Sequence, residues 1–308
     1  MNLHSLNNEG TEGNQQITRQ VTVADENGQL HTVNAVSGDM LKHIQVEHLT
    51  ALAIQKGLPV CEPAKMRHPS RIAAVDKFAP KGTTDSAVTD LILQQCAVTD
   101  LTGTLLTEGR STARNSVVEW AWLVGLPEQT TTESFIHLKR VADPGAIASG
   151  SAGNLGQNIF HRPASSGTYA AVVNVEAARV GFNDLSRQVP DAVQKNRNER
   201  YQVLLQSLLY TFLEPNGAQR NTQNPHILGF EGVVTVSYGI CPAPTVSPLN
   251  DNYRTEVEAI QSTLVSMLGE GTVEVTPFES LSEFAAIVSN LAQNTVPFDV
   301  NATAKKEA

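Results

Sequence analysis

A chain of 308 residues, 41% of them hydrophobic, can bury a large core and is typical of a soluble globular protein. Its formal net charge of −9 argues against binding of nucleic acid by bulk electrostatics, although a local basic groove is compatible with it. The three cysteines are far apart and odd in number, which suits a reducing cytoplasm. No secretory signal or membrane-length apolar run is visible.

The first fifty-odd residues predict a short strand, a polar loop, a hairpin and a helix. Residues 1–8 form the strand, NNEGTEGNQQ the loop, and residues 16–36 the hairpin, with its turn at Asp25 to Gly28. A helix over 40–55 follows, begun by Ser37 or Asp39 and stopped by Gly57 and Pro59. Lys42 in its first turn either binds a phosphate, aided by free backbone N–H groups, or belongs to a solvated face.

The next stretch is irregular and then helical. Residues 59–81 are mixed in charge and resemble a protruding, partly mobile insertion, and Asp85 begins a second helix. Cys61 and His68 lack the close spacing of metal-ligand pairs, so the sequence predicts neither a metal site nor a cofactor. Arg110 and Arg114 precede an apolar run; they form either a phosphate clamp or a surface pair with Glu108 and Glu119.

Residues 135–168 predict a long hairpin. FIHLKRV rises, ADPGAIASGSAGNLG forms a small-residue tip, and QNIFHR returns toward a β-type run over Thr168 to Val180. The return carries amides, an aromatic ring and cations: Gln157, Asn158, Phe160, His161 and Arg162. Cations suit phosphates and aromatic faces suit unstacked bases, so this stretch favours a single-stranded nucleic acid; an ordinary surface hairpin is the alternative.

The last third predicts an amphipathic helix and a small α/β segment. Leu204, Leu208 and Phe212 share a helical face with Tyr201, and the stripe faces a core. With the strands before and after it, this helix predicts a split βαβ unit. Two further helices, over 257–267 and 284–291, and a strand at 273–275 follow. Acidic residues are concentrated after Asp251, whereas the predicted basic front consists of Lys139, Arg140, His161, Arg162, Lys195, Arg197 and Arg200.

Several segments, in order, resemble one family. They are LNNEGTEGN, VSGDMLKH, DLTGTLLTEGRSTARNSVVEW, HRPASSGTYA with RVGFND, and GAQRNTQNPHI. The set is similar to the DevR family of CRISPR-associated proteins, the RNA-binding backbone subunits of type I Cascade complexes. The resemblance implies an α+β fold with a modified ferredoxin-like (RRM-like) palm. It implies one domain over 1–308, a finger-like insertion at 56–115 and a thumb hairpin at 137–168, and we expect a disordered tail at 301–308.

The resemblance also nominates the residues beside the RNA. They are Asn7, Asn14, Lys42, His43, Arg110, Arg114, Ser116, Gln157, Phe160, His161, Arg162 and Arg220. The partners it implies are the CRISPR guide RNA, the target DNA strand paired to it, further copies of the chain in a head-to-tail filament, and other Cascade subunits.

Three functions stay open at this point. The first is a non-enzymatic subunit that polymerises along guide RNA and leaves sequence choice to base pairing. The second is an RNA-cleaving backbone subunit of a type III-like complex, with Asp39 and His161 as candidates, although no paired acid and base is visible. The third is a structural oligomer that needs no RNA.

Overall fold

The computed structural model describes residues 1–140 and 157–301 of the chain. Two compact units are present, and we describe each by itself. The first unit comprises Met1–Met40, Trp122–Ala171 and Asn216–Leu228. The second comprises Leu41–Ala121, Val172–Pro215 and the chain from Gly229 onward. The fold is therefore mixed α+β, as the sequence predicts, and no described helix is long and apolar enough to cross a membrane.

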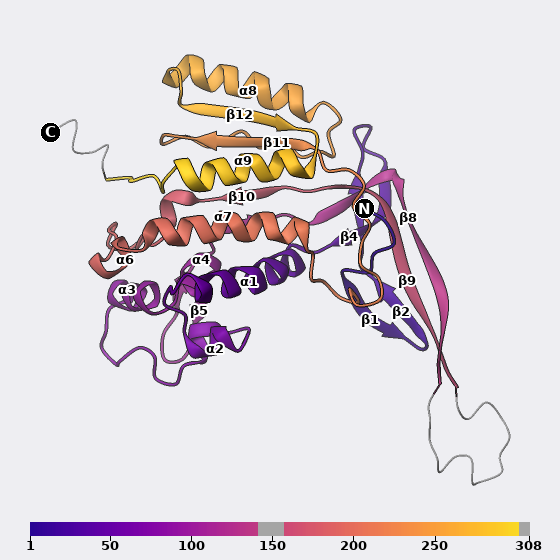
Figure 1. Ribbon diagram of the computed structural model, residues 1–308, viewed down its shortest axis with the longest axis horizontal. Coiled ribbons are helices and arrows are strands. Elements are labelled where there is room, and N and C mark those ends of the chain that lie inside the picture. Colours follow the sequence, from indigo (N-terminus) through magenta and orange to yellow (C-terminus); the bar gives the residue numbers. More distant parts are fainter. Residues whose placement is uncertain (141–156, 302–308) are drawn as a thin grey trace, which may run out of the picture. The chain divides into compact units, whose positions relative to one another are not determined.

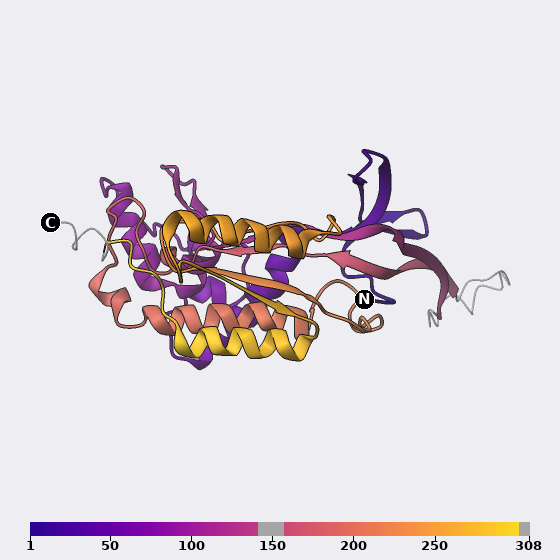
Figure 2. The same ribbon diagram turned by 90° about the horizontal axis from the view of Figure 1, so that it is seen from above.

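The first unit is built on a six-stranded sheet in the order β1-β2-β9-β8-β4-β3. Its strands are β1 (Asn8–Glu12), β2 (Gln15–Thr18), β3 (Gln20–Ala24), β4 (Leu30–Val36), β8 (Leu123–Arg140) and β9 (Gln157–Ala170). The pair β2–β9 is parallel and the other pairs are antiparallel. The long arrows of β8 and β9 run side by side in Figures 1 and 2. The rising and returning strands of the predicted hairpin are confirmed, whereas its tip at 141–156 lies outside the described residues.

Two predictions for this unit are wrong. The polar loop before residue 16 is instead the hairpin β1–β2, which turns at Gly13 and Asn14; Gly13 has a φ of +58°, a value that glycine adopts without strain. Residues 1–7 form no strand. They contribute only isolated bridges, from Asn2 to His226 and from His4 to Ser165. The predicted β3–β4 hairpin is confirmed, and Asp25 closes its turn by accepting from the N–H groups of Asn27 and Gln29.

A bulge interrupts the β8–β9 ladder. Its register shifts between Gly125 and Thr130, and Gly167 lies opposite this point with a φ of +147°. A Cβ atom on Gly167 would overlap the carbonyl oxygen of Gln129, so only glycine fits here. The bulge sets the register of the strand that carries the predicted cation and aromatic cluster.

The second unit is mainly helical. Its helices are α1 (Gly38–Gln55, whose first turn belongs to the first unit), α2 (Glu62–Lys65), η1 (Arg71–Ala74), α3 (Asp85–Gln95), α4 (Ala97–Thr102), η2 (Ala177–Arg179), α6 (Asp191–Gln194), α7 (Arg197–Leu213), α8 (Tyr253–Leu268) and α9 (Leu281–Asn294). Ser37 begins α1, because its hydroxyl accepts from the N–H of Met40. Thr84, and not the predicted Asp85, caps α3 in the same way, by accepting from Ala87.

Short strand pairs complete the second unit: β5 (Thr104–Leu106) with β6 (Thr112–Arg114), β7 (Val118–Trp120) with β10 (Val173–Val175), and β11 (Gly232–Ser237) with β12 (Val273–Phe278). The predicted continuous strand from Thr168 to Val180 is wrong, since β9 ends at Ala170 and only β10 and the single turn η2 follow. Among the described residues, β10 and β11 pair with other strands and not with each other, so the predicted βαβ unit is not seen as one sheet.

The apolar stripe of α7 forms the core of the second unit, as predicted. Tyr201, Leu204, Leu205 and Leu208 are buried, and they pack with residues of α1, α3 and α4. Helices α8 and α9 lie to either side of β11 and β12 in Figures 1 and 2. Phe212, Phe230, Phe278 and Phe284 form an aromatic cluster with ring centroids 4.9 to 5.8 Å apart, which joins α7 to this segment.

Candidate nucleic-acid interface

A pocket of about 290 Å³ opens in the first unit between the β1–β2 turn and the first half of β9. Its lining consists of Thr11, Gly13, Asn14, Gln16, Phe160, His161, Arg162 and Gln219. The structure thus brings together four of the residues predicted to bind RNA, namely Asn14, Phe160, His161 and Arg162.

The backbone holds the two sides of this pocket together. Strand β2 pairs with β9 in parallel, with Gln15 beside His161, and the His161 N–H donates to the carbonyl oxygen of Asn14 over 2.8 Å. Because successive side chains of a strand alternate between faces, Phe160 and Arg162 share one face of β9 and His161 points to the other. The turn and strand therefore present an amide, a ring and a cation at a fixed spacing.

Arg162 lies against the ring of Phe160. Its guanidinium carbon is 4.8 Å from the ring centroid, and its Nη1 donates to the Thr222 hydroxyl over 3.3 Å. On β8, His137 stacks on the same ring with centroids 5.7 Å apart and planes 16° apart. Both His137 and Arg162 contact the ring of Phe160, so the ring supports the guanidinium. No carboxylate pairs with Arg162 within the described residues, which leaves its charge for an anion.

The third side of the pocket comes from residues 216–228. The Gln219 amide donates to the side-chain oxygen of Gln16, the Gln223 amide donates to the Pro163 carbonyl over 2.9 Å, and the Ala218 N–H donates to Leu6 over 3.0 Å. Gln16 and Gln219 were missed by sequence reasoning. Gln219 sits in the predicted motif GAQRNTQNPHI, directly before Arg220, which is half-buried and does not line the pocket.

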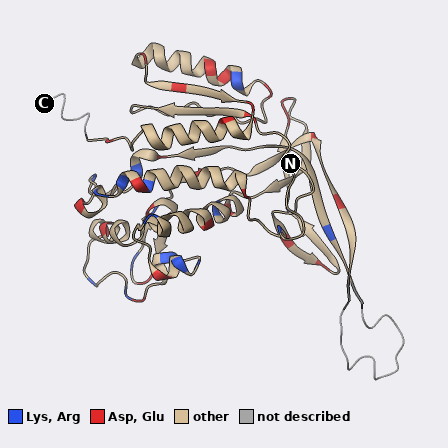
Figure 3. Ribbon diagram, in the orientation of Figure 1, with Lys and Arg blue, Asp and Glu red and all other residues tan. Residues whose placement is uncertain are grey.

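Few charges surround this site. Figure 3 shows that the ribbons of β8 and β9 carry few charged residues, so an anion here would meet a local cation and not a broad basic surface. The side chain of Gln157 lies outside the described part of the structure, as do those of Lys139, Arg140 and Asn158.

Asn7 is not the exposed loop amide that was predicted. It is 6% exposed, and its side-chain oxygen accepts the Ser37 N–H over 2.7 Å. Its carbonyl oxygen accepts from both Thr18 and Arg19. All of these contacts are internal to the first unit, so Asn7 ties the chain ahead of β1 to β2 and β4.

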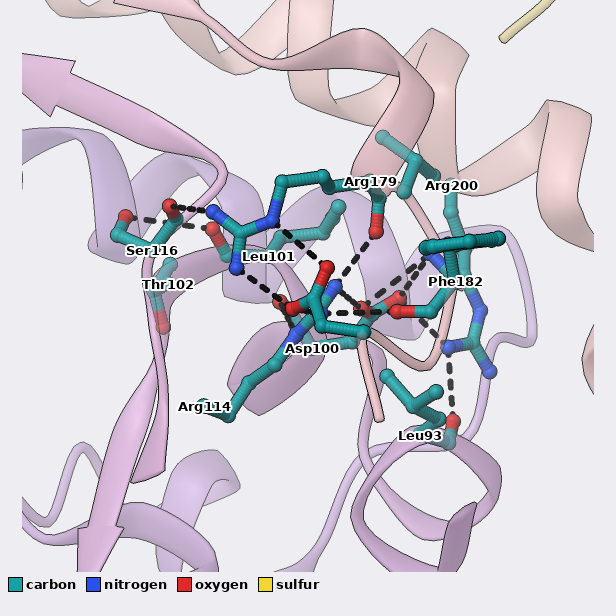
Figure 4. A network of polar contacts seen from close by, with 12 residues as sticks. Leu93, Asp100, Leu101, Thr102, Arg114, Ser116, Arg179, Phe182 and Arg200 are labelled. Atoms are coloured by element: carbon teal, nitrogen blue, oxygen red, sulfur yellow. Dashed lines mark hydrogen bonds and ion pairs between the residues drawn. The ribbon is translucent and has the colours of Figure 1, made fainter. Parts of the chain in front are cut away.

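Arg114 is likewise not a surface clamp. Its side chain has no exposed area and forms ion pairs with Asp100 at 2.8 Å and with Asp184 at 2.9 Å (Figure 4). The carbonyl oxygens of Phe182 and Arg179 accept from the same guanidinium. An arginine so fully engaged inside the second unit cannot reach a phosphate without breaking that unit, which corrects the prediction.

Asp100 is the centre of this network. Its side chain is also fully buried, and Arg200 approaches it to 2.9 Å while donating to the carbonyl oxygen of Leu93 (Figure 4). At the edge of the network, burial would raise the pKa of Asp184, but Arg179 and Arg114 lower it below its ordinary value. Arg197 and Arg200 are buried, so they do not form the basic front predicted from their position in the sequence.

The remaining predicted residues of the second unit are held locally. Arg110 donates to the Thr83 carbonyl over 2.6 Å and lies 3.9 Å from Asp85, and its side chain is 17% exposed. The Ser116 hydroxyl donates to the carbonyl oxygen of Val118 over 2.7 Å. Lys42 is half-buried, whereas His43 is exposed and lies 3.8 Å from Glu47 one turn along α1.

Among the described residues, no group of three or more histidine, cysteine, aspartate or glutamate side chains that could hold a metal ion occurs. The His68 imidazole accepts a hydrogen bond from the Ser70 N–H, and it is not part of a metal-ligand cluster with Cys61.

Comparison with known proteins identifies a family. A family model described as "CRISPR-associated negative auto-regulator DevR/Csa2" matches residues 1–258. No curated protein matches. Two solved structures, "CRISPR RNA-guided surveillance complex, pre-nicking" and "CRISPR RNA-guided surveillance complex", are 14% and 15% identical, with TM-scores of 0.48 and 0.46. Each covers 94% of this chain and 96% of its own. Both scores are below 0.5, so the assignment rests on the family model.

Proposed function

Because the chain belongs to the DevR/Csa2 family of CRISPR-associated proteins, we propose that it is a non-catalytic subunit that binds CRISPR guide RNA within a type I Cascade effector. Copies of the chain follow one another head to tail along the RNA, beside the other Cascade subunits. They hold the guide for pairing with a target DNA strand, and base pairing supplies the sequence choice. Contacts between unlike faces do not close on themselves and give a helical filament.

The observation that carries this proposal is the pocket at β9. It gathers a cation supported by an aromatic ring, a histidine and the amides of Asn14 and Gln219 at one position. A guanidinium donates parallel hydrogen bonds to phosphate oxygens, and amides donate to phosphate or ribose oxygens. Such a set binds the backbone of a strand without reading its bases, as a guide-holding subunit requires.

The shape of the β8–β9 hairpin supports the role of a thumb that meets a neighbouring copy. Phe135, Ile136 and Leu138 on β8 are 44%, 66% and 63% exposed. Because side chains alternate along a strand, Ile136 and Leu138 share one face of β8 and Phe135 lies on the other, so the ladder presents apolar side chains that suit burial against another protein surface. In this proposal residues 137–168 are the thumb, residues 56–115 the finger, and the remainder a modified ferredoxin-like palm.

The test is binding of a labelled single-stranded RNA, followed by fluorescence anisotropy. Arg162→Ala should weaken binding about tenfold and reduce the slope of log affinity against log salt by about 1, because one phosphate contact is lost. Lys56→Ala is the matched control: Lys56 is an exposed cation at the end of α1, and its removal should change affinity less than about twofold.

Three outcomes contradict the proposal. One is equal affinity of wild type and Arg162→Ala at every salt concentration. Another is assembly of the purified protein that persists after nuclease treatment with no excess absorbance at 260 nm, which would indicate a structural oligomer. The third is cleavage of guide or target RNA that Asp39→Ala or His161→Ala abolishes, which would indicate a nuclease.

A further inference from the structure

Two cysteines that are 35 residues apart in sequence meet in the second unit. The Sγ atoms of Cys61 and Cys96 lie 3.2 Å apart, and both thiols are free. Cys61 directly precedes α2, and Cys96 separates α3 from α4. The backbone fixes the meeting, because the N–H of Ala97 donates to the carbonyl oxygen of Pro59 over 2.7 Å.

The two thiols differ in access. Cys96 has no exposed area, whereas Cys61 is partly exposed. A reagent in solution therefore reaches Cys61 first, and Cys96 stands behind it. In thiol–disulfide exchange, an accessible thiolate first attacks the oxidant, and a second cysteine of the same chain then displaces the mixed disulfide. The accessible Cys61 and the buried Cys96 suit these two steps.

The surroundings favour a thiolate. The Arg71 guanidinium donates to the carbonyl oxygen of Gly103 over 2.7 Å, and its Nε has no hydrogen-bond partner among the described residues. Burial lowers the pKa of Arg71, while its attraction to the two sulfurs acts in the opposite direction. A hydrogen bond from Cys61 lowers the pKa of the Cys96 thiol to about 6, and the same contact raises that of Cys61. The two thiols therefore titrate as a pair, with the S–H of Cys61 donating to the sulfur of Cys96.

We propose that Cys61 and Cys96 form a reversible dithiol–disulfide site, which a small-molecule disulfide such as oxidised glutathione converts to an intramolecular crosslink. The Cys61 proton moves to Cys96, and the Cys61 thiolate attacks one sulfur of the oxidant, releasing one thiolate. Cys96 then loses its proton to water, attacks the Cys61 sulfur and expels the second thiolate. Two electrons pass from the cysteine pair to the oxidant, which leaves as two thiolates that take up protons from water.

The crosslink joins the base of the segment between α1 and α3 to the start of α4. It closes a loop that contains α2, η1 and α3, and a closed loop restricts the unfolded chain. Oxidation should therefore stabilise the second unit in a way that a reductant reverses. This inference is independent of RNA binding.

The experiment treats the full-length protein with oxidised glutathione, alkylates the remaining thiols and maps tryptic peptides. We expect one of the three thiols, Cys241, to remain, and the peptides 57–65 and 82–110 to be linked with the loss of two hydrogen atoms. The melting temperature should rise by roughly 5 °C and return on addition of dithiothreitol. Cys241→Ser is the matched control and should crosslink as wild type does; Cys61→Ser should not.

Several results overturn the proposal. Retention of all three thiols shows that the pair is not reactive. A glutathione adduct that stays on Cys61 shows that Cys96 does not resolve it. A crosslink through Cys241 or between two copies shows that Cys61 and Cys96 are not the reactive pair. An unchanged or lowered melting temperature shows that the disulfide is not compatible with the native second unit.

Discussion

Arg114 and Arg162 stand in similar sequence contexts, each beside a strand and near small polar residues, yet the structure places them in opposite environments. Arg114 is fully buried and paired with Asp100 and Asp184. Arg162 lines a pocket and rests on the ring of Phe160. Whether an arginine is buried in ion pairs or can bind a ligand depends on carboxylates that are distant in sequence. A local sequence motif therefore does not predict which of the two it is.

Removal of each arginine side chain should change the free energy of unfolding by a different amount. A buried charge left without its partner is strongly destabilising, whereas a cation over a ring at a pocket rim contributes little to folding. The two arginines should therefore separate stability from RNA affinity.

The largest expected effect is on stability at Arg114. Arg114→Ala leaves buried Asp100 with Arg200 and the Gly181 N–H, and we expect a loss of about 3–5 kcal/mol in the free energy of unfolding. Urea denaturation followed by circular dichroism measures it. Arg162→Ala, the surface counterpart, should change the same free energy by less than about 1 kcal/mol; equal losses in both variants would remove the distinction.

A second effect on stability is expected at His4, a buried imidazole in the first unit. His4 is 2% exposed and hydrogen-bonded to the Tyr169 hydroxyl at 2.8 Å, and burial lowers its pKa from 6.5 to about 4. The folded state therefore favours neutral His4. The corresponding stability is complete above pH 6.5 and is lost as the pH falls toward 4, with a total on the order of 3 kcal/mol.

Urea unfolding at stepped pH measures this loss. In His4→Gln the slope between pH 6.5 and 4 should decrease, whereas His43→Gln, which removes an exposed imidazole, should keep the slope of wild type. An unchanged slope in His4→Gln would contradict the role of His4.

A third and smaller effect concerns how Phe160 acts. Since Arg162 lies against its ring, Phe160→Ala should weaken RNA binding by releasing Arg162, and it should add little in an Arg162→Ala background. A double-mutant cycle on RNA affinity should give a coupling of about 0.5–1 kcal/mol. Additive losses would show instead that Phe160 contacts the RNA by itself.

The smallest effect on RNA affinity is expected at Arg110, whose environment is intermediate between those of Arg114 and Arg162. Its guanidinium is held by the Thr83 carbonyl near Asp85 but is not fully buried. Arg110→Ala should cost about 1 kcal/mol of stability and leave RNA affinity within about twofold of wild type. A tenfold loss of affinity without loss of stability would place Arg110 with Arg162 instead.

Local patterns predicted much of the fold. The stripe of α7, the hairpin β3–β4, the stops after α1 and the long pair β8–β9 follow from periodicity, turn residues and caps, which act over a few neighbours. The strand bearing Phe160, His161 and Arg162 was identified for the same reason.

Contacts between distant segments could not be predicted. The sequence around Arg114 does not predict its ion pair with Asp184, and the sequence around Gln16 does not predict its hydrogen bond with Gln219. Only tertiary packing brings these residues together. The buried Asn7 and the meeting of Cys61 with Cys96 have the same origin. The β1–β2 hairpin was missed because its residues have low strand propensity and depend on pairing with β9.

The most direct test of the central claim is to locate RNA on the protein by ultraviolet crosslinking of the purified complex, followed by mass spectrometry of the peptides. If RNA lies in the pocket, crosslinks should form in the β1–β2 turn at Gly13–Asn14 and in β9 at Phe160–Arg162. Crosslinks that spare both segments, in a sample that retains bound RNA, would contradict the claim.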